Sequence, residues 1–125
     1  AKTVTIDVTS VNDAPAGADN TVSALEDLGY VFDPADFGFS DLDDVPANGF
    51  AGIIITTLPA SGTLLLSGNP VSATDFIAYA DISNLSYLPP ANANGAGFTD
   101  FTFQVVDDGG TADGGFDTDA TPNIM

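Results

Sequence analysis

Acidic side chains are concentrated at the positions where this chain is expected to turn. The sequence has 18 acidic residues and a single basic one, Lys2, which gives a net charge of −17 over 125 residues. The acidic turn stretches are V-N-D-A-P at 11–15, E-D-L-G-Y at 26–30, S-D-L-D-D at 40–44 and V-V-D-D-G-G at 105–110. So much negative charge opposes compaction, and hard divalent cations with oxygen ligands offset it best. The pattern predicts a calcium-dependent protein.

The residue types that the chain lacks exclude most enzyme classes. There is no His, Cys or Trp, and Lys2 accounts for the only basic side chain, so there is no Arg. Such a chain cannot build a Ser-His-Asp or Cys-His triad, a zinc site with nitrogen or sulfur ligands, or an arginine clamp on phosphate. We therefore expect that the protein is not an enzyme.

The same composition argues against two classes of partner. Nucleic acids and anionic lipid surfaces are bound through clustered Lys and Arg, which an acidic chain does not have. The longest apolar runs, at 53–55 and 64–66, are far shorter than the roughly 20 residues that span a bilayer. We expect no nucleic-acid partner and no membrane insertion.

Hydrophobic patterning predicts many short β-strands. Val4, Ile6 and Val8 alternate with polar residues over 3–8, which is the period of a half-buried strand. A stretch rich in turn formers follows, and Phe101, Phe103 and Val105 show the same alternation near the end of the chain. Further strands are expected at 21–25, 29–33, 51–57, 62–66, 76–79, 85–88 and 98–107, with one helical turn within 72–84. Short, evenly punctuated strands predict an all-β sandwich or barrel, and the length fits one domain.

Four longer stretches occur here in one combination. They are T-V-T-I-D-V-T-S-V-N-D-A-P at 3–15, I-T-T-L-P-A-S-G-T-L-L-L-S-G at 55–68, Y-L-P-P-A-N-A-N-G at 87–95 and F-T-F-Q-V-V-D-D-G-G at 101–110. Together they resemble the bacterial cadherin-like tandem repeats of large secreted adhesins of the repeat-in-toxin type. The resemblance implies a cadherin-like or immunoglobulin-like Greek-key β-sandwich. It also implies a calcium-rigidified spacer, secreted or on the cell surface, whose partners are neighbouring repeats of the same chain.

The resemblance also implies where the repeat boundaries fall. Residues 1–14 resemble the last strand and linker motif of a preceding repeat, and residues 15–125 resemble one repeat that lacks its own final strand. The sequence is thus expected to be a piece of a longer chain. We hypothesise that the strand at 3–8 fills the vacant strand position, either in its own domain or, by strand exchange, in another copy.

The calcium ligands that the resemblance implies come from separate turns. The linker would supply Asn12 and Asp13, a D-x-D motif Asp41 and Asp43, and the turn after the last long strand Asp107. Glu26 would serve a second junction at the opposite end of the domain, and Asp44 and Asp108 are second choices. The alternative is that these aspartates cap backbone amides in turns and bind no metal.

Two other functions remain open at this point. A module that binds polysaccharide or another copy of itself could use Tyr30, Tyr79 and Tyr87 as stacking surfaces, although aromatic residues of a sandwich are more often buried. A glycoside hydrolase would need two carboxylates facing each other across a cleft at about 5–9.5 Å. No pair in the sequence is typical of such a site.

Overall fold

The protein is an all-β sandwich of two antiparallel sheets, described by a computed structural model of residues 1–125. Short 3-10 helices (η) connect some of the strands, and no helix is long or apolar enough to cross a membrane. The elements in chain order are β1 (Tyr30–Val31), η1 (Pro34–Phe37), β2 (Phe50–Thr57), β3 (Thr63–Leu66), β4 (Asn69–Pro70), β5 (Phe76–Ala78), η2 (Tyr79–Asn84), β6 (Leu85–Leu88), β7 (Thr102–Asp107), η3 (Ala112–Gly114) and β8 (Asn123–Ile124).

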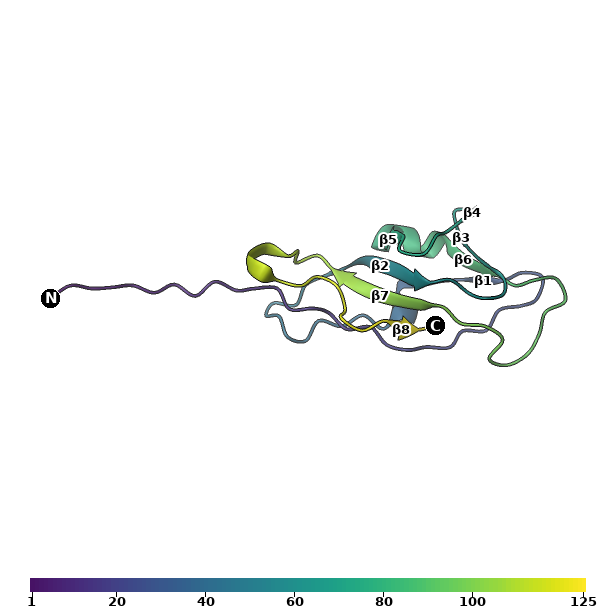
Figure 1. Cartoon of the computed structure of the whole chain (residues 1–125), viewed down its shortest axis with the longest axis horizontal. Helices are drawn as coiled ribbons and strands as arrows, with labels where there is room; N and C mark the ends of the chain where they lie inside the picture. The colour runs from purple at the N-terminus through teal and green to yellow at the C-terminus, as the bar shows by residue number, and fades with distance from the viewer.

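The two sheets are built from strands that are far apart in the sequence (Figure 1). One sheet has the strand order β1-β6-β3-β4 and the other β5-β2-β7-β8. The longest ladder joins β2 to β7, with Ile53 opposite Val105 and Ile55 opposite Phe103. Because the chain crosses between the sheets from β1 to β2 and again from β2 to β3, the pairing has the interleaved connectivity of a Greek-key sandwich.

The core lies between the sheets and is filled by alternate residues of the long strands. Ile53 and Ile55 of β2 and Phe103 and Val105 of β7 are completely buried, so the predicted alternation at 101–105 is confirmed. Phe37 of η1 packs edge-to-face on Phe103, with 4.9 Å between ring centroids. The β2–β7 ladder is thus the rigid centre of the domain, and the loops at its two ends are positioned by it.

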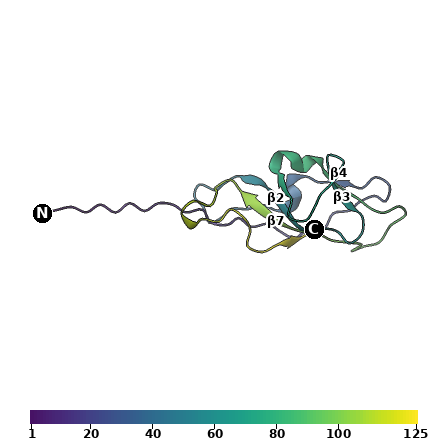
Figure 2. The ribbon, with the colours of Figure 1, turned by 45° about the horizontal axis from the view of Figure 1, so that its top comes forward.

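Residues 1–11 form an extended arm that leaves the sandwich at one end (Figures 1 and 2). Val4, Ile6 and Val8 are 85%, 83% and 93% exposed, and the segment 3–8 has no strand partner. The expectation that 3–8 fills a strand position in its own domain is therefore wrong. Pairing of this segment with another copy stays a prediction.

Other differences from the expected strands lie at the rim of the sandwich. Residues 21–25 make only an isolated bridge between Leu25 and Gly29, and the strand expected from residue 98 begins at Thr102. Strands β4 and β8, of two residues each, were not predicted. The helical turn expected within 72–84 is η2. Residues 22–24 and 98–100 make no backbone hydrogen bonds, whereas Phe101 pairs with Met125 and Leu25 accepts the amides of Leu28 and Gly29.

Candidate metal centre

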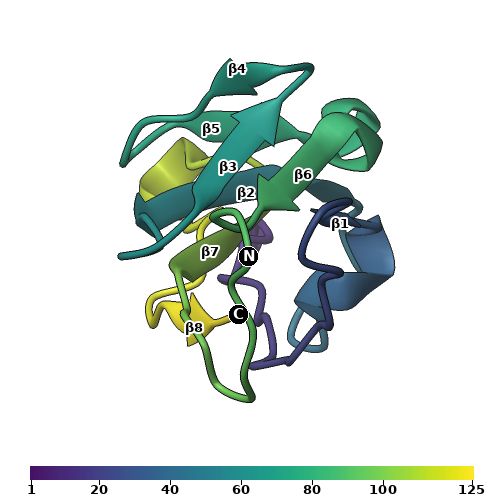
Figure 3. The ribbon, with the colours of Figure 1, turned by 90° about the vertical axis from the view of Figure 1, so that its right-hand side faces the viewer.

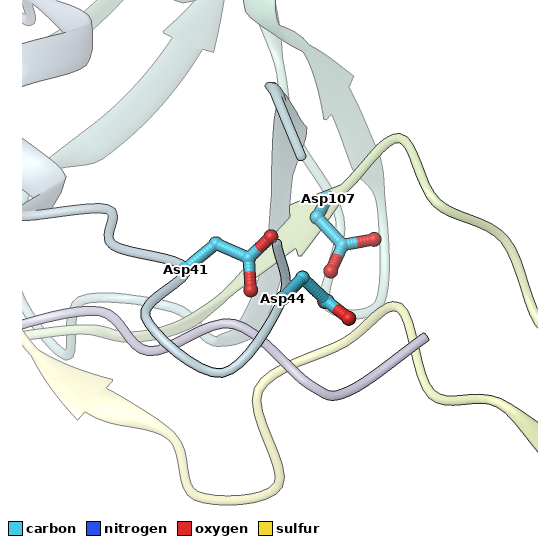
Figure 4. Close-up of side chains that lie close together, drawn as sticks. All are labelled: Asp41, Asp44 and Asp107. Carbon is cyan, nitrogen blue, oxygen red and sulfur yellow. The ribbon is translucent and has the colours of Figure 1, made fainter. Parts of the chain in front are cut away.

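Three aspartates converge at the end of the sandwich from which the arm leaves (Figure 4). Asp41 and Asp44 lie in the loop before β2, and Asp107 is the last residue of β7. One carboxylate oxygen from each lies within 4.8 Å of the other two. Oxygens on opposite sides of a calcium ion are about 4.6–5.2 Å apart, since each Ca–O distance is about 2.3–2.6 Å. The spacing is therefore compatible with all three carboxylates binding one ion.

A short backbone pairing and one hydrogen bond position the loop that carries Asp41. Ser40 and Ala16 exchange two backbone hydrogen bonds of 2.8 Å, which fixes the chain immediately before Asp41. The Asp41 side chain is 6% exposed, and its Oδ2 accepts the backbone amide of Asn48 at 2.6 Å. This bond closes the loop over 41–48 and brings Asp44 back toward the end of β7.

The β7 strand and the turn after it orient Asp107. Its backbone amide donates to the carbonyl of Asp117 at 2.8 Å, and its side chain is 2% exposed. Oδ1 accepts two hydrogen bonds, from the Gly109 amide at 2.9 Å and from Nδ2 of Asn12 at 2.8 Å. These donors hold one oxygen and leave Oδ2 free for another partner.

Asn12 ties the base of the arm to this site. Besides Asp107, its Nδ2 donates to the carbonyls of Gly110 at 2.9 Å and Phe116 at 2.8 Å. Its Oδ1 accepts from the side-chain amide of Asn48, and its backbone carbonyl accepts the amide of Phe116 at 2.9 Å. A Cβ at Gly109 would collide with the Asn12 side chain, so this turn requires glycine for the close approach. The arm is thus anchored at the aspartates.

Two buried carboxylate oxygens at the site have no hydrogen-bond partner. They are Oδ1 of Asp41 and Oδ2 of Asp107. Burying an ionised oxygen without a partner is costly, and native structures leave few such atoms. The only basic side chain, Lys2, is exposed on the arm, away from the cluster. A bound cation would satisfy both oxygens and neutralise the repulsion between the carboxylates.

Asp44 belongs to the cluster, and its pKa is shifted. Desolvation raises the pKa of Asp44, and the neighbouring charges of Asp41 and Asp13 raise it further, whereas the hydrogen bond from the Asp13 amide lowers it. That amide lies 3.2 Å from Oδ2 of Asp44, and Nδ2 of Asn48 donates to the same oxygen at 3.1 Å. Desolvation and the neighbouring carboxylates thus disfavour the charged form of Asp44.

The structure brings together some of the residues implied by the sequence and leaves others apart. Asp41 and Asp107 meet, and Asn12 contacts Asp107. Asp13 is exposed and contributes its backbone amide to Asp44.

Three other acidic candidates lie outside the cluster. Asp43 is exposed, and the next residue, Asp44, takes the position expected for it. Asp108 is exposed and accepts the Gly49 amide at 2.9 Å. Glu26 is exposed and lines a groove at the other end of the domain, so it is not part of this site. The three acidic residues at 41, 43 and 44 look alike in the sequence, and only the loop closure by Asn48 separates their roles.

The fold and the site together define an all-β sandwich with a cluster of carboxylate oxygens at one end. Comparisons with protein-family models, with curated proteins and with solved structures find no match to this chain.

Proposed function

We propose that this chain is a calcium-binding, calcium-rigidified spacer domain of a secreted or cell-surface bacterial adhesin. One observation supports the metal most strongly. Asp41 and Asp107 are buried, each has a carboxylate oxygen without a partner, and with Asp44 they place three oxygens within 4.8 Å where no basic side chain is near. The resemblance of the four sequence stretches to cadherin-like adhesin repeats supports the rest of the proposal.

The rigidifying role follows from what the site connects. Asp41 and Asp44 belong to the loop before β2, Asp107 ends the central ladder, and Asn12 fastens the arm to Asp107. A cation held by these carboxylates would link the loop, the strand end and, through Asn12, the base of the arm. The direction in which the preceding segment leaves the domain would then be fixed, which is what a spacer of stacked domains needs.

Calcium fits this site better than the smaller magnesium ion. The carboxylates come from a loop and a strand end, and backbone carbonyls and water can complete an irregular shell of six to eight oxygens. Magnesium demands a near-ideal octahedron at about 2.0–2.1 Å and gives up its water reluctantly. Extracellular calcium modules work at dissociation constants of about 10⁻⁴–10⁻³ M.

The same carboxylates are poorly arranged for hydrolysis of a glycoside. Their oxygens lie within 4.8 Å of one another, whereas paired catalytic acids are about 5–9.5 Å apart across a cleft that holds the sugar. The groove at the other end of the domain and a hollow beside Tyr79 are lined by other residues. We therefore keep the expectation that the chain is not an enzyme.

Isothermal titration calorimetry with calcium and with magnesium, at matched ionic strength, tests the proposal. We expect one saturable calcium site in the wild-type chain, much weaker binding of magnesium, and loss of calcium binding in Asp41→Asn. Asp43→Asn is the matched control. It removes the same charge two residues further along the chain, where the Asp43 side chain faces solvent. Equal binding by Asp41→Asn and the wild type, or equal loss in both variants, would refute a specific site.

A second candidate function, polysaccharide binding, is favoured by one surface feature. Phe39 and Phe50 are stacked at 4.7 Å, and Tyr79 meets Phe50 edge-on at 5.6 Å beside a hollow that Asp33 also lines. Tyr79 is 50% exposed, as a sugar platform requires.

The other two tyrosines considered from the sequence do not form such a platform. Tyr87 is 9% exposed and donates to the Ser61 carbonyl, and the Tyr30 hydroxyl is engaged by Asp36. Glycan-array binding by the isolated chain that is lost in Tyr79→Ala would favour the polysaccharide function, and absence of binding would remove it.

A further inference from the structure

The tripeptide Ala-Asn-Gly occurs twice in this chain, at 47–49 and at 93–95. An asparagine followed by glycine is prone to spontaneous deamidation, because glycine has no Cβ to keep its amide nitrogen away from the asparagine side chain. Asn48 and Asn94 have the same residue on each side, so an unfolded chain would treat them alike. A difference in their reactivity would therefore come from the folded structure.

The reacting groups at Asn48 are held by hydrogen bonds. Its side-chain amide nitrogen donates to Oδ2 of Asp44 at 3.1 Å and to Oδ1 of Asn12. The Gly49 amide, which would be the nucleophile, donates to Oδ1 of Asp108 at 2.9 Å. Attack of this amide on the Asn48 side chain requires these bonds to break. The folded structure therefore protects Asn48.

The second copy lies in the loop between β6 and β7, at the end of the sandwich opposite the arm (Figures 1 and 3). Asn94 is exposed, its side chain makes no hydrogen bond, and the Gly95 amide donates to no acceptor. A Cβ placed on Gly95 would meet no atom within 4 Å outside its chain neighbours. Neither reacting group has a partner to lose.

Asn92 shows that exposure in this loop is not sufficient. It is exposed and lies two residues before Asn94, but the residue that follows it is Ala93. The Ala93 amide donates to the carbonyl of Pro90 at 3.2 Å, and the Cβ of alanine hinders approach to the asparagine side chain. Deamidation in the loop is therefore expected at Asn94 and not at Asn92.

We propose that Asn94 is a site of spontaneous deamidation and that the fold protects Asn48 from the same reaction. The deprotonated amide nitrogen of Gly95 attacks the side-chain carbonyl carbon of Asn94, forms a new C–N bond and expels the side-chain nitrogen as ammonia. Water then opens the five-membered succinimide at one of its two carbonyls, which gives aspartate or isoaspartate. Water is the only co-reactant, and no electrons are transferred.

The two positions differ in what the product would do to the fold. Residues 94–100 make no backbone hydrogen bond, so the methylene that isoaspartate inserts into the backbone breaks none there. At Asn48 a carboxylate would face Oδ2 of Asp44 and Oδ1 of Asn12, two acceptors to which it has no proton to donate. The fold thus exposes the copy that can change with little effect and shields the copy that closes the aspartate loop. The proposal does not rest on metal binding, since Asn94 lies outside the cluster.

Incubation of the full chain in EDTA at neutral pH, followed by mass spectrometry of proteolytic fragments, tests the proposal. An isoaspartate-specific methyltransferase identifies the isoaspartate product. We expect Asn94 to react at least about tenfold faster than Asn48 and Asn92, because a protected site reacts only after local opening. In urea that unfolds the chain, Asn48 and Asn94 should react at the same rate. Asn94→Gln should remove the modification from the loop, since a longer side chain would have to close a larger ring.

The comparison of the two Ala-Asn-Gly copies also defines the results that would overturn the proposal. One is an Asn94 that stays unmodified in the folded chain. Another is an equal rate at Asn48 and Asn94 before unfolding, which would show that the hydrogen bonds at Asn48 give no protection. A difference in rate that persists unchanged in urea would assign the effect to local sequence and would overturn it also.

Discussion

Replacing Asp107 by Asn should raise the stability of the calcium-free protein and remove most of the stabilisation that calcium gives. The variant keeps the shape of the side chain, and its amide oxygen can still accept the hydrogen bonds of Gly109 and Asn12. The changed atom is Oδ2, the buried oxygen that has no partner. In EDTA the substitution removes one of three crowded negative charges, so it should raise the melting temperature. In calcium it removes a ligand, so the variant should gain little from the ion.

The expected magnitudes can be worked from the site and from the size of the domain. Two unit charges 4 Å apart repel by between about 1 and 4 kcal/mol as the effective dielectric constant falls from that of water to about 20. Calcium at a hundred times its dissociation constant stabilises the folded state by about 2.7 kcal/mol. For 125 residues the entropy of unfolding is about 0.26 kcal/mol/K, so this gain raises the wild-type melting temperature by about 10 °C.

Thermal unfolding followed by circular dichroism measures both effects, with sodium chloride added to match ionic strength. Matching is needed because salt screens a net charge of −17 and stabilises the fold without any specific site. Asp43→Asn removes the same charge outside the cluster and should keep the full response to calcium. The reasoning is refuted if Asp107→Asn and Asp43→Asn respond equally to calcium, or if Asp107→Asn is less stable than the wild type in EDTA.

Three further predictions concern the anchor of the arm and the titration of single carboxylates. Asn12→Ala should lower the free energy of unfolding by about 1–3 kcal/mol, measured by urea denaturation, because it leaves partly buried acceptors unpaired. In EDTA, Asp44→Asn should be more stable than the wild type at neutral pH, because the charged form of Asp44 is disfavoured in the folded state. The difference in stability should shrink as the pH falls through the raised pKa of Asp44 toward 3.8, since the wild-type carboxyl is then protonated. Unfolding curves over this pH range measure the difference. The backbone amide of Ile124, followed by Nδ2 of Asn123, lowers the pKa of Asp19. Asp19 therefore stabilises β8 above pH 3.8 and loses this effect as the pH falls from 3.8 through the lowered pKa; hydrogen exchange at Ile124 in Asp19→Asn and the wild type measures it.

The centre of the sandwich could be predicted from the sequence because its periodicity is strong. Phe103 and Val105 of the predicted alternation and the strand predicted at 51–57 fall in the β2–β7 ladder, where each buried side chain faces the opposite sheet. The segment 3–8 has an equally clear alternation and yet is unpaired. Periodicity reports that a segment can bury one face, and it carries no information on which molecule provides the cover.

The acidic cluster was predictable in its segments and less so in its residues. Asp41 and Asp107 are implied by the resemblance to cadherin-like repeats, and both lie in the cluster. Asp44 lies in the cluster and Asp43 lies outside it, because the direction of each side chain depends on how Asn48 closes the loop. The donors of Asn12 likewise depend on Gly110 and Phe116, which are about a hundred residues away in the sequence. Such contacts are set by the fold and leave no local signal.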